Sequence, residues 1–236
     1  MRPAAATAGS DRGRDATALL KLATFFSASF PIGAFSYSHG LEWLIAEGRL
    51  PDAASVRDWI GDLLRIGSGW NDAVLFAEAW RRTTAGDCPG LAAAAELAGA
   101  LAGTRERHLE TVAQGGAFAV AAEAGWPCEA TAWLRDRETP YPIAAGAVAA
   151  GHAIPLELGL AAFLNAFAAN LVSVAVRLVP LGQSAGLGAH AALHPLIRDV
   201  AARAAAASLD DLGAATIASD MASMRHETLY SRIFRT

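Results

Sequence analysis

Serine and histidine side chains stand close together in one short stretch near the start of the chain. Ser36 and Ser38 precede His39 and Gly40 in a pattern one residue type away from Gly-x-Ser-x-Gly, the turn that exposes the nucleophilic serine of α/β-hydrolases. That turn requires a preceding β-strand, whereas here a Pro-Ile-Gly turn beginning at Pro31 comes first. We favour a serine hydroxyl that caps the following helix. A small helical hydrolase that uses either serine with His39 is the alternative.

Histidine and methionine side chains in the second half of the chain could bind a soft metal ion such as nickel or copper. His190 and His194 are four residues apart, so one helical face could present both rings. No third ligand is evident beside them, and Pro195 follows directly. Met221 and His226 offer further ligands, so a metal carrier is a third hypothesis. Ordinary packing of these side chains is the favoured interpretation, and no metal site is predicted.

Other common catalytic and binding patterns are absent from the sequence. Lys21 is the only lysine, and no glycine-rich phosphate-binding loop lies near it, which excludes a P-loop. The net charge is −4 and no basic cluster occurs, so nucleic acid is not an expected partner. Cys88 and Cys128 have neither disulfide-framework nor zinc-ribbon spacing. We therefore expect no catalytic residue and no stably bound cofactor.

The elements that position these residues are predicted to be helices. Hydrophobic residues make up 53% of the 236 positions and charged residues 18%, and alanine accounts for much of the excess. Apolar residues between Val56 and Leu64 recur with the 3.6-residue repeat, and Ser55 is predicted to cap that helix. No strict alternation or hairpin signal suggests a strand. The sequence predicts an all-α, single-domain bundle of about nine or ten helices.

Composition divides the chain into three segments. Residues 1–15 are predicted to be a flexible leader, which lacks the apolar core of a signal peptide, so a cytoplasmic location is expected. Residues 16–223 are the helical domain. Within it, residues 158–176 are uncharged, but their asparagines and alanines favour a core helix over a membrane span. Residues 224–236 form a C-terminal tail.

The C-terminal tail differs from the alanine-rich domain. It combines large apolar side chains with arginines, which are Leu229, Tyr230, Ile233 and Phe234 beside Arg225, Arg232 and Arg235. Aromatic residues and arginine are enriched at binding hot spots. Because chain ends are loose unless something holds them, the tail either folds back on its own domain or becomes ordered against a partner.

Three motifs together resemble the UreF family of urease accessory proteins. They are FPIGAFSYSHGLE at 30–42, LVPLGQ at 178–183 and MRHETLYSRIFR at 224–235. Their order and separation match as well, so the resemblance extends over nearly all of the chain after the leader. Two departures occur. Many family members have a second Gly-Gln pair shortly after Gln183, where this chain has Gly186-Leu187-Gly188, and residues 104–116 follow the family pattern only loosely.

The resemblance implies an all-helical cytoplasmic protein with no chemistry of its own and no contact with membranes. It further implies a complex with the accessory protein UreD, also called UreH, and with the GTPase UreG, which delivers nickel to apo-urease. GTP would be bound by UreG, and nickel would be handled by the whole complex. A homodimer of this chain is also implied.

Residue by residue, the resemblance assigns partner binding to the tail, through Arg225, His226, Glu227, Tyr230, Ser231, Arg232 and Phe234. It assigns a partner or dimer surface to the N-terminal motif, through Pro31, Gly33, Ser36, Tyr37, Gly40 and Glu42. Arg225 is the strongest single candidate, because a guanidinium can make several directed hydrogen bonds. Backbone freedom at the glycines and helix capping at a serine are the structural alternatives.

Overall fold

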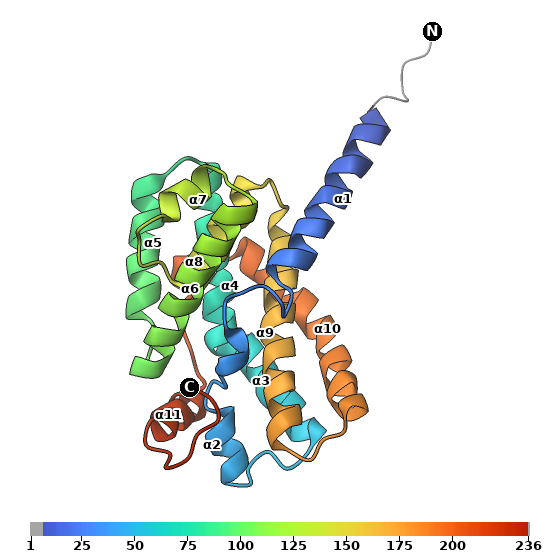
Figure 1. Cartoon of the computed structure of the whole chain (residues 1–236), viewed down its shortest axis with the longest axis vertical. Helices are drawn as coiled ribbons and strands as arrows, with labels where there is room; N and C mark the ends of the chain where they lie inside the picture. Colours follow the sequence, from blue (N-terminus) through green and yellow to red (C-terminus); the bar gives the residue numbers. More distant parts are fainter. Residues whose placement is uncertain (1–6, 236) are drawn as a thin grey trace.

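The structure is a computed structural model that describes the backbone of residues 7–235 and the side chains of residues 16–235. Within this part of the chain it contains eleven α-helices, two short 3-10 helices and no strand, which confirms the predicted all-α single domain (Figure 1). The helices are α1 (Thr7–Phe25), η1 (Ala34–Ser36), α2 (Leu41–Ala46), α3 (Ala53–Ile66), α4 (Ser68–Thr84), α5 (Cys88–Ala100), α6 (Arg105–Gly125), α7 (Glu129–Leu134), α8 (Tyr141–Gly151), α9 (Leu156–Leu178), α10 (Gln183–Ala206), η2 (Leu209–Asp211) and α11 (Ile217–His226).

Helix α3 shows how closely local sequence determines an element and where it misleads. The predicted apolar stripe is confirmed, with Val56 and Leu64 among its buried residues. The predicted start is wrong, because the N-cap is Asp52 and not Ser55. The carboxylate of Asp52 accepts the N–H of Ser55 at 2.8 Å, and the Ser55 hydroxyl accepts the N–H of Asp52 at 3.2 Å. An acidic residue at the N-cap with a hydroxyl three positions later satisfies the same free amides as the expected box.

The core lies where α4, α8 and α9 pack together, with α6 against α8 and α10 against α9. Small residues permit the close crossings. A β-carbon on Gly146 of α8 would lie 2.3 Å from the carbonyl oxygen of Phe76 in α4, so only glycine fits there. The alanine excess of the sequence is therefore explained by tight contacts between helices.

Helix α9 is the one helix in the described part of the chain that has the length and apolar content of a membrane span. It runs through the bundle and contacts α10, α4 and α2. About 50% of its most apolar window is buried inside the fold. These contacts are those of a core helix, as predicted for residues 158–176.

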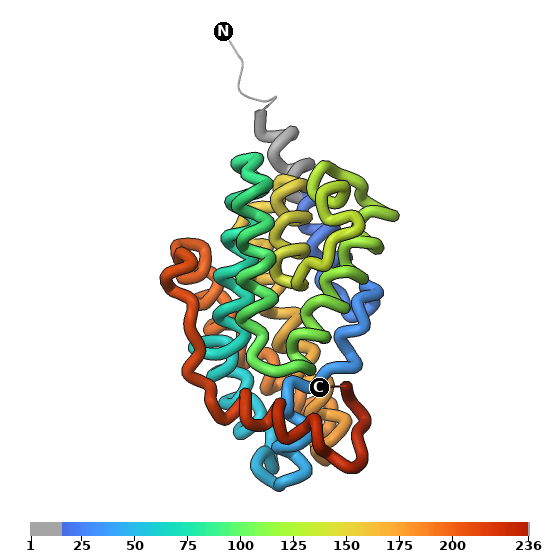
Figure 2. Tube along the Cα trace, turned by 90° about the vertical axis from the view of Figure 1, so that its left-hand side faces the viewer, coloured from blue at the N-terminus to red at the C-terminus, as the bar shows by residue number. Residues whose placement is uncertain are grey.

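The two ends of the described chain behave differently. Helix α1 projects from the bundle and packs on it only through its last turns, where Leu22 and Phe25 are buried (Figure 1). It begins at Thr7, inside the segment predicted as a leader, and residues 1–6 of that segment lie outside the described residues. The C-terminal tail instead returns to the domain, and α11 lies beside α2 in both views (Figures 1 and 2).

Candidate functional site

Residues far apart in the sequence meet in one junction, which consists of the buried Glu42, Glu106, His226 and Phe234 and the more exposed Arg232. Glu42, in the first turn of α2, is buried at its centre. One carboxylate oxygen, Oε1, accepts the N–H of Ile233 at 2.7 Å, and Oε2 accepts the N–H of Phe234 at 3.0 Å. A single carboxylate thus fixes two consecutive backbone groups of the tail.

A left-handed turn brings α2 into the junction. His39 and Gly40 both have positive φ, 53° and 76°. A β-carbon on Gly40 would lie 2.8 Å from the backbone nitrogen of Ser223, so α11 approaches this turn closely. The hydroxyl of Ser38 accepts the N–H of Glu42 at 3.4 Å, but the N-cap residue of α2 is Gly40, so the predicted serine cap is wrong in position. The aromatic and glycine-rich motif at 30–42 therefore shapes the seat of the C-terminus.

His226, the last residue of α11, lies between two carboxylates and is 0% exposed. Its Nε2 is 2.9 Å from Oε2 of Glu42, and its Nδ1 is 2.9 Å from Oε2 of Glu106. Arg232 donates from Nη1 to the second oxygen of Glu106 at 2.5 Å. The tail is therefore held by charged groups of α2 and α6, at points both before and after its exposed turn.

Phe234 completes the junction from the end of the tail. Its ring is buried, and the guanidinium of Arg177 from α9 stacks over it at 5.1 Å from the ring centroid. The next residue, Arg235, donates its N–H to the carbonyl of Ser36 at 2.7 Å. Cation–π stacking and this backbone bond attach the tail to α9 and to the N-terminal motif as well.

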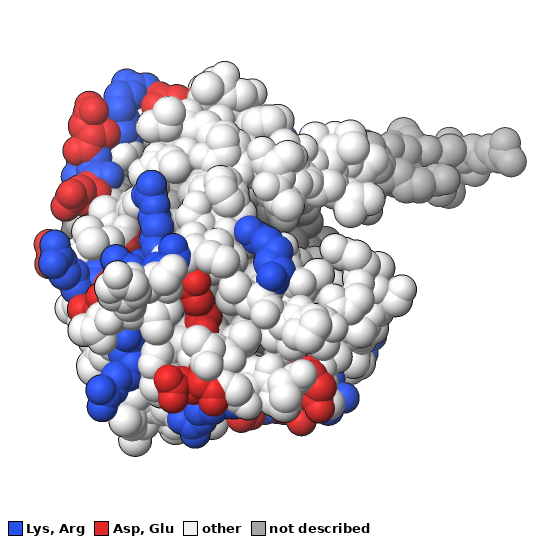
Figure 3. Space-filling view, turned by 60° about the horizontal axis from the view of Figure 1, so that its bottom comes forward, with Lys and Arg blue, Asp and Glu red and all other residues white. Residues whose placement is uncertain are grey.

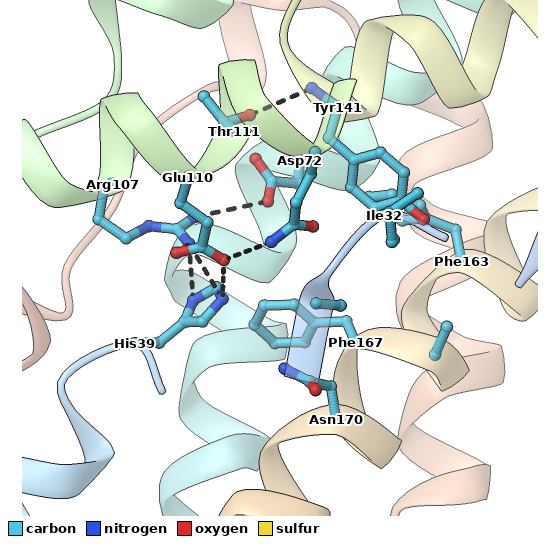
Figure 4. A pocket seen from close by; sticks show the side chains of 13 residues that line it. Ile32, His39, Asp72, Arg107, Glu110, Thr111, Tyr141, Phe163, Phe167 and Asn170 are labelled. Atoms are coloured by element: carbon cyan, nitrogen blue, oxygen red, sulfur yellow. Dashed lines mark hydrogen bonds and ion pairs between the residues drawn. The ribbon is translucent and has the colours of Figure 1, made fainter. Parts of the chain in front are cut away.

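A second polar cluster borders a cavity of about 60 Å³ between α4, α6, α9 and the turn before α2 (Figure 4). Glu110 is its centre, and its carboxylate faces Nε2 of His39 at 2.8 Å, Nη1 of Arg107 at 2.8 Å and the amide of Gln114 at 2.9 Å. Asp72 lies 3.7 Å from Arg107. Aromatic rings border the rest of the cavity, from Tyr141, Phe163 and Phe167.

Burial and neighbouring charges shift the pKa values of this cluster in different directions. Burial opposes ionisation of Glu110, but Arg107 and His39 outweigh it and lower its pKa to about 2. Burial raises the pKa of Asp72 to about 6, against the attraction of Arg107. Burial and the charge of Arg107 lower the pKa of His39, despite the opposing pull of Glu110. A neutral His39 ring then donates from Nε2 to Glu110 and accepts at Nδ1 from Arg107, which is 2.9 Å away.

Comparison with known sequences shows the family to which the chain belongs. The family model of UreF matches residues 50–194. The urease accessory protein UreF 1 of Brucella canis is 52% identical over 223 residues, which is 93% of this chain and 95% of the relative. Urease accessory protein UreF of Agrobacterium fabrum is 50% identical, and the match covers 93% of this chain and 96% of that relative. Urease accessory protein UreF of Rhodopseudomonas palustris is 48% identical, and the match covers 94% of this chain and 94% of that relative.

The chain belongs to the UreF family of urease accessory proteins. This confirms the resemblance that the three sequence motifs indicated. Its relatives are named as urease accessory proteins, which indicates a general role in urease maturation.

The residues of the N-terminal motif lie at different depths in this UreF protein: Glu42 belongs to the junction, and Gly40 lies in the turn that packs against α11. Tyr37 is buried, and its carbonyl accepts the side-chain amide of Asn170 at 3.3 Å. Gly33 has a φ of 71°, which confirms that its turn needs backbone freedom. Ser36 and Gly33 are half-buried, and Pro31 is exposed. Partner or dimer contact through this motif stays a prediction.

The UreF tail is fixed by some of its residues and displays others. His226 and Phe234 are buried in the junction. Tyr230 is fully exposed and Ile233 is 74% exposed. The tail therefore folds back on its own domain, one of the two outcomes expected, and still presents side chains outward. The remaining residues predicted to bind a partner are exposed as well, namely Arg225, Glu227, Ser231 and Arg232.

Sequence reasoning missed the charged residues of α6 and α9 that complete the junction and the cluster at the cavity. They are Glu106, Arg107 and Glu110 of α6 and Arg177 of α9. A signal for the first set was present, because Glu106, Glu110 and Gln114 recur every four residues and so share one helical face. Charged side chains on a face that packs inward require buried partners. Arg177 gave no comparable signal, since nothing in the local sequence indicates that a ring from the chain end covers it.

The arrangement around Ser38 and His39 does not suit a hydrolase. Both residues are buried, and the Ser38 hydroxyl is already within hydrogen-bond distance of a backbone amide of α2. His39 lies between Arg107 and Glu110. An activated serine needs exposure to its substrate, and the burial of Ser38 does not provide it.

The metal-carrier hypothesis also lacks a suitable cluster. In the part of the chain that the structure describes, no group of three or more His, Cys, Asp or Glu residues could hold a metal ion. The rings of His190 and His194 contact each other, with centroids 5.1 Å apart. His226 is the residue bonded between two carboxylates in the junction.

Replacing Asp72 with asparagine is expected to stabilise the protein at pH 7 by about 1–2 kcal/mol. The pKa of Asp72 is about 6 when folded against 3.8 ordinarily, so its ionisation opposes folding, and the penalty grows between pH 4 and pH 6. The expected stabilisation is smaller than the raised pKa alone would give, because the side chain of Asp72 is 22% exposed and water screens its charge. Urea unfolding of wild type and variant at pH 4 and pH 7 measures the difference.

The control for this prediction is Asp58→Asn, which removes an exposed carboxylate of α3. It should change stability by less than about 0.5 kcal/mol at either pH. If Asp72→Asn had the same effect at pH 4 as at pH 7, ionisation of Asp72 would not be the cause.

Proposed function

We propose that this UreF protein is a non-enzymatic component of the cytoplasmic complex that matures urease. In this proposal it binds UreD, also called UreH, through its C-terminal tail, and it recruits the GTPase UreG and regulates its activity. The assembled complex delivers nickel to apo-urease, with GTP bound by UreG. Nickel is the cargo of the assembly and not a resident ion of this chain.

The observation that carries the proposal is that buried contacts fix the backbone of the tail while other side chains of the tail are exposed to solvent. Glu42 and Glu106 hold its backbone and His226 in place, while Tyr230 and Ile233 extend into solvent. Fixing the backbone in advance lowers the entropy that binding would otherwise cost. Exposed tyrosine, isoleucine and arginine on an ordered loop are the residue types of a binding hot spot.

Two further features support an assembly with several contacts. Charged side chains gather on one side of the surface in Figure 3, whereas the area next to α1 carries few. Leu19 and Leu20 of α1 are adjacent large apolar residues, and both are exposed. We assign this helix to contact with a second copy of the chain, so that the complex contains a UreF homodimer.

Tyr230→Ala is expected to weaken binding to UreD by about 30-fold, since loss of a hot-spot aromatic costs about 2 kcal/mol. Arg225→Ala should weaken it by about tenfold, through loss of directed hydrogen bonds. Co-expression with UreD and UreG, followed by affinity capture and titration, measures both effects. Light scattering of the captured complex counts the copies of this chain and tests the homodimer.

The matched control is Arg198→Ala, which removes an exposed arginine of α10, on a helix away from the tail. It should leave capture unchanged, and circular dichroism should show the same helix content for all three variants. Full binding by both tail variants would remove the tail from the interface. Failure of the wild-type chain to recover UreD and UreG in soluble form would contradict the proposal as a whole.

A further inference from the structure

The two buried histidines of this fold have opposite surroundings. His39 lies between a cation, Arg107, and a carboxylate, Glu110. A neutral ring satisfies both neighbours, because one nitrogen accepts a hydrogen bond and the other donates one. His226 lies between the carboxylates of Glu42 and Glu106, each 2.9 Å from a ring nitrogen. A neutral ring cannot donate to both of them.

Counting protons at His226 shows what the docked tail requires. With a neutral ring, one nitrogen would turn its lone pair toward an ionised oxygen in a place that water does not reach. Glu42 already accepts two backbone N–H groups, and Glu106 accepts from Arg232. Every oxygen of the two carboxylates thus already faces an N–H donor or a ring nitrogen of His226. The additional proton therefore rests on His226, as an imidazolium that donates from both nitrogens.

We propose that docking of the C-terminal tail on Glu42 takes up one proton, which His226 holds between Glu42 and Glu106. The charges of the junction then sum to zero, because two carboxylates face one imidazolium and the guanidinium of Arg232. Without the proton, the buried group would carry an uncompensated negative charge, which is costly away from water.

The other charged groups nearby do not replace this proton. The carboxylates of Glu42 from α2 and Glu106 from α6 face the ring of His226. Arg232 of the tail is the cation next to them, and it contacts Glu106. Arg225 of α11 and Glu227, the residue directly after that helix, are both exposed and have opposite charges. Further along, Asp220 interacts with Arg107 and so belongs to the other cluster.

The sign of the resulting pH dependence follows from the proton count. A free imidazole is largely neutral above about pH 6.5, so the released tail holds one proton fewer than the docked tail. Docking therefore weakens as pH rises, by up to about tenfold for each pH unit. Resting on the proposed function, this makes the outward display of Tyr230 and Ile233 to a partner a proton-dependent state.

Hydrogen exchange of the full chain, without any partner, tests the inference independently of the proposed function. The protection factors of the Ile233 and Phe234 amides, corrected for intrinsic exchange, are expected to fall by up to about tenfold per pH unit between pH 7 and 9. In Glu106→Gln the side-chain amide can donate to Nδ1 of His226 and accept from Arg232, so a neutral ring suffices. Protection should then become independent of pH. The control is Glu227→Gln, which makes the same substitution at an exposed residue directly after His226. It should behave like wild type.

Nitrogen NMR of the His226 ring gives a second measurement, which is made on the wild-type protein. The variant His226→Gln serves only to assign the signal of this ring. Both ring nitrogens should carry protons at pH 7.5 while the tail amides are protected. A ring with one bare nitrogen in the docked state would overturn the inference. So would protection in the wild type that does not change with pH, or an equal pH dependence in Glu106→Gln.

Discussion

Replacing Glu42 with alanine is expected to release the tail and to lower the free energy of unfolding by about 3–5 kcal/mol. The carboxylate accepts the N–H groups of Ile233 and Phe234 and faces His226, all inside the fold. Alanine would leave these three donors without an acceptor and would remove one of the two charges that balance His226 and Arg232. Freed from Glu42, the tail should also withdraw the ring of Phe234 from Arg177.

Two measurements check this result separately. Urea unfolding gives the change in stability, and hydrogen exchange of residues 228–235 reports whether the tail is still docked. Glu47→Ala is the control, because Glu47 is an exposed glutamate just past the end of the same helix. Its removal should change stability by less than about 0.5 kcal/mol. Unchanged protection of the tail in Glu42→Ala would show that Glu42 does not hold it.

The binding consequence of Glu42→Ala separates the two roles of the tail. If UreD recognises the ordered tail, as proposed, the variant should lose binding although every exposed residue of the tail is still present. Tyr230→Ala should lose binding with the tail still docked. Comparing the two variants therefore distinguishes a missing contact from a missing conformation.

Sequence alone predicts the helical fold because its signals are local. The apolar repeat from Val56 to Leu64 requires one buried face, whatever packs against it. Errors arise where two local solutions compete, as at the start of α3, where Asp52 caps the helix in place of Ser55. The same competition occurs after α10. Ser208 caps a short 3-10 turn there, and α11 begins only at Ile217.

The candidate site was only half predictable, for a different physical reason. The motifs at 30–42 and 224–235 stood out by composition, and each was interpreted as a surface for partners. The two motifs also contact each other, through Glu42 and the residues 191 and 192 positions later. No periodicity reports a contact between two segments so far apart. Glu106 completes the junction from a third segment, in which the family resemblance was weakest.

The fold also explains why the tail motif mixes two kinds of residue. His226 and Phe234 face inward and fix the tail, whereas Tyr230 and Ile233 face outward. From sequence all four look like binding residues, because aromatic and charged groups at a chain end suit either role. Burial separates the two pairs, and the exposed pair is the one to which the proposed function assigns partner binding.

Gly40→Ala is expected to be the most disruptive single-methyl change in the N-terminal motif. Gly40 has a φ of 76°, and an alanine there carries about 1 kcal/mol of backbone strain. Its β-carbon would also lie 2.8 Å from the nitrogen of Ser223 and 2.9 Å from the carbonyl carbon of Ala222. Because both atoms are backbone, α11 must move away, which adds about 2–3 kcal/mol and displaces His226 from its two carboxylates.

Gly33→Ala supplies the matched control for this change. Gly33 has nearly the same backbone conformation, with a φ of 71°, but no atom lies within 4 Å of the position that its β-carbon would occupy. It should therefore show the strain alone, about 1 kcal/mol in urea unfolding, with full protection of the tail amides. The difference between the two variants isolates the contact of α2 with α11. Equal losses in both would mean that the close approach at Gly40 contributes nothing to docking of the tail.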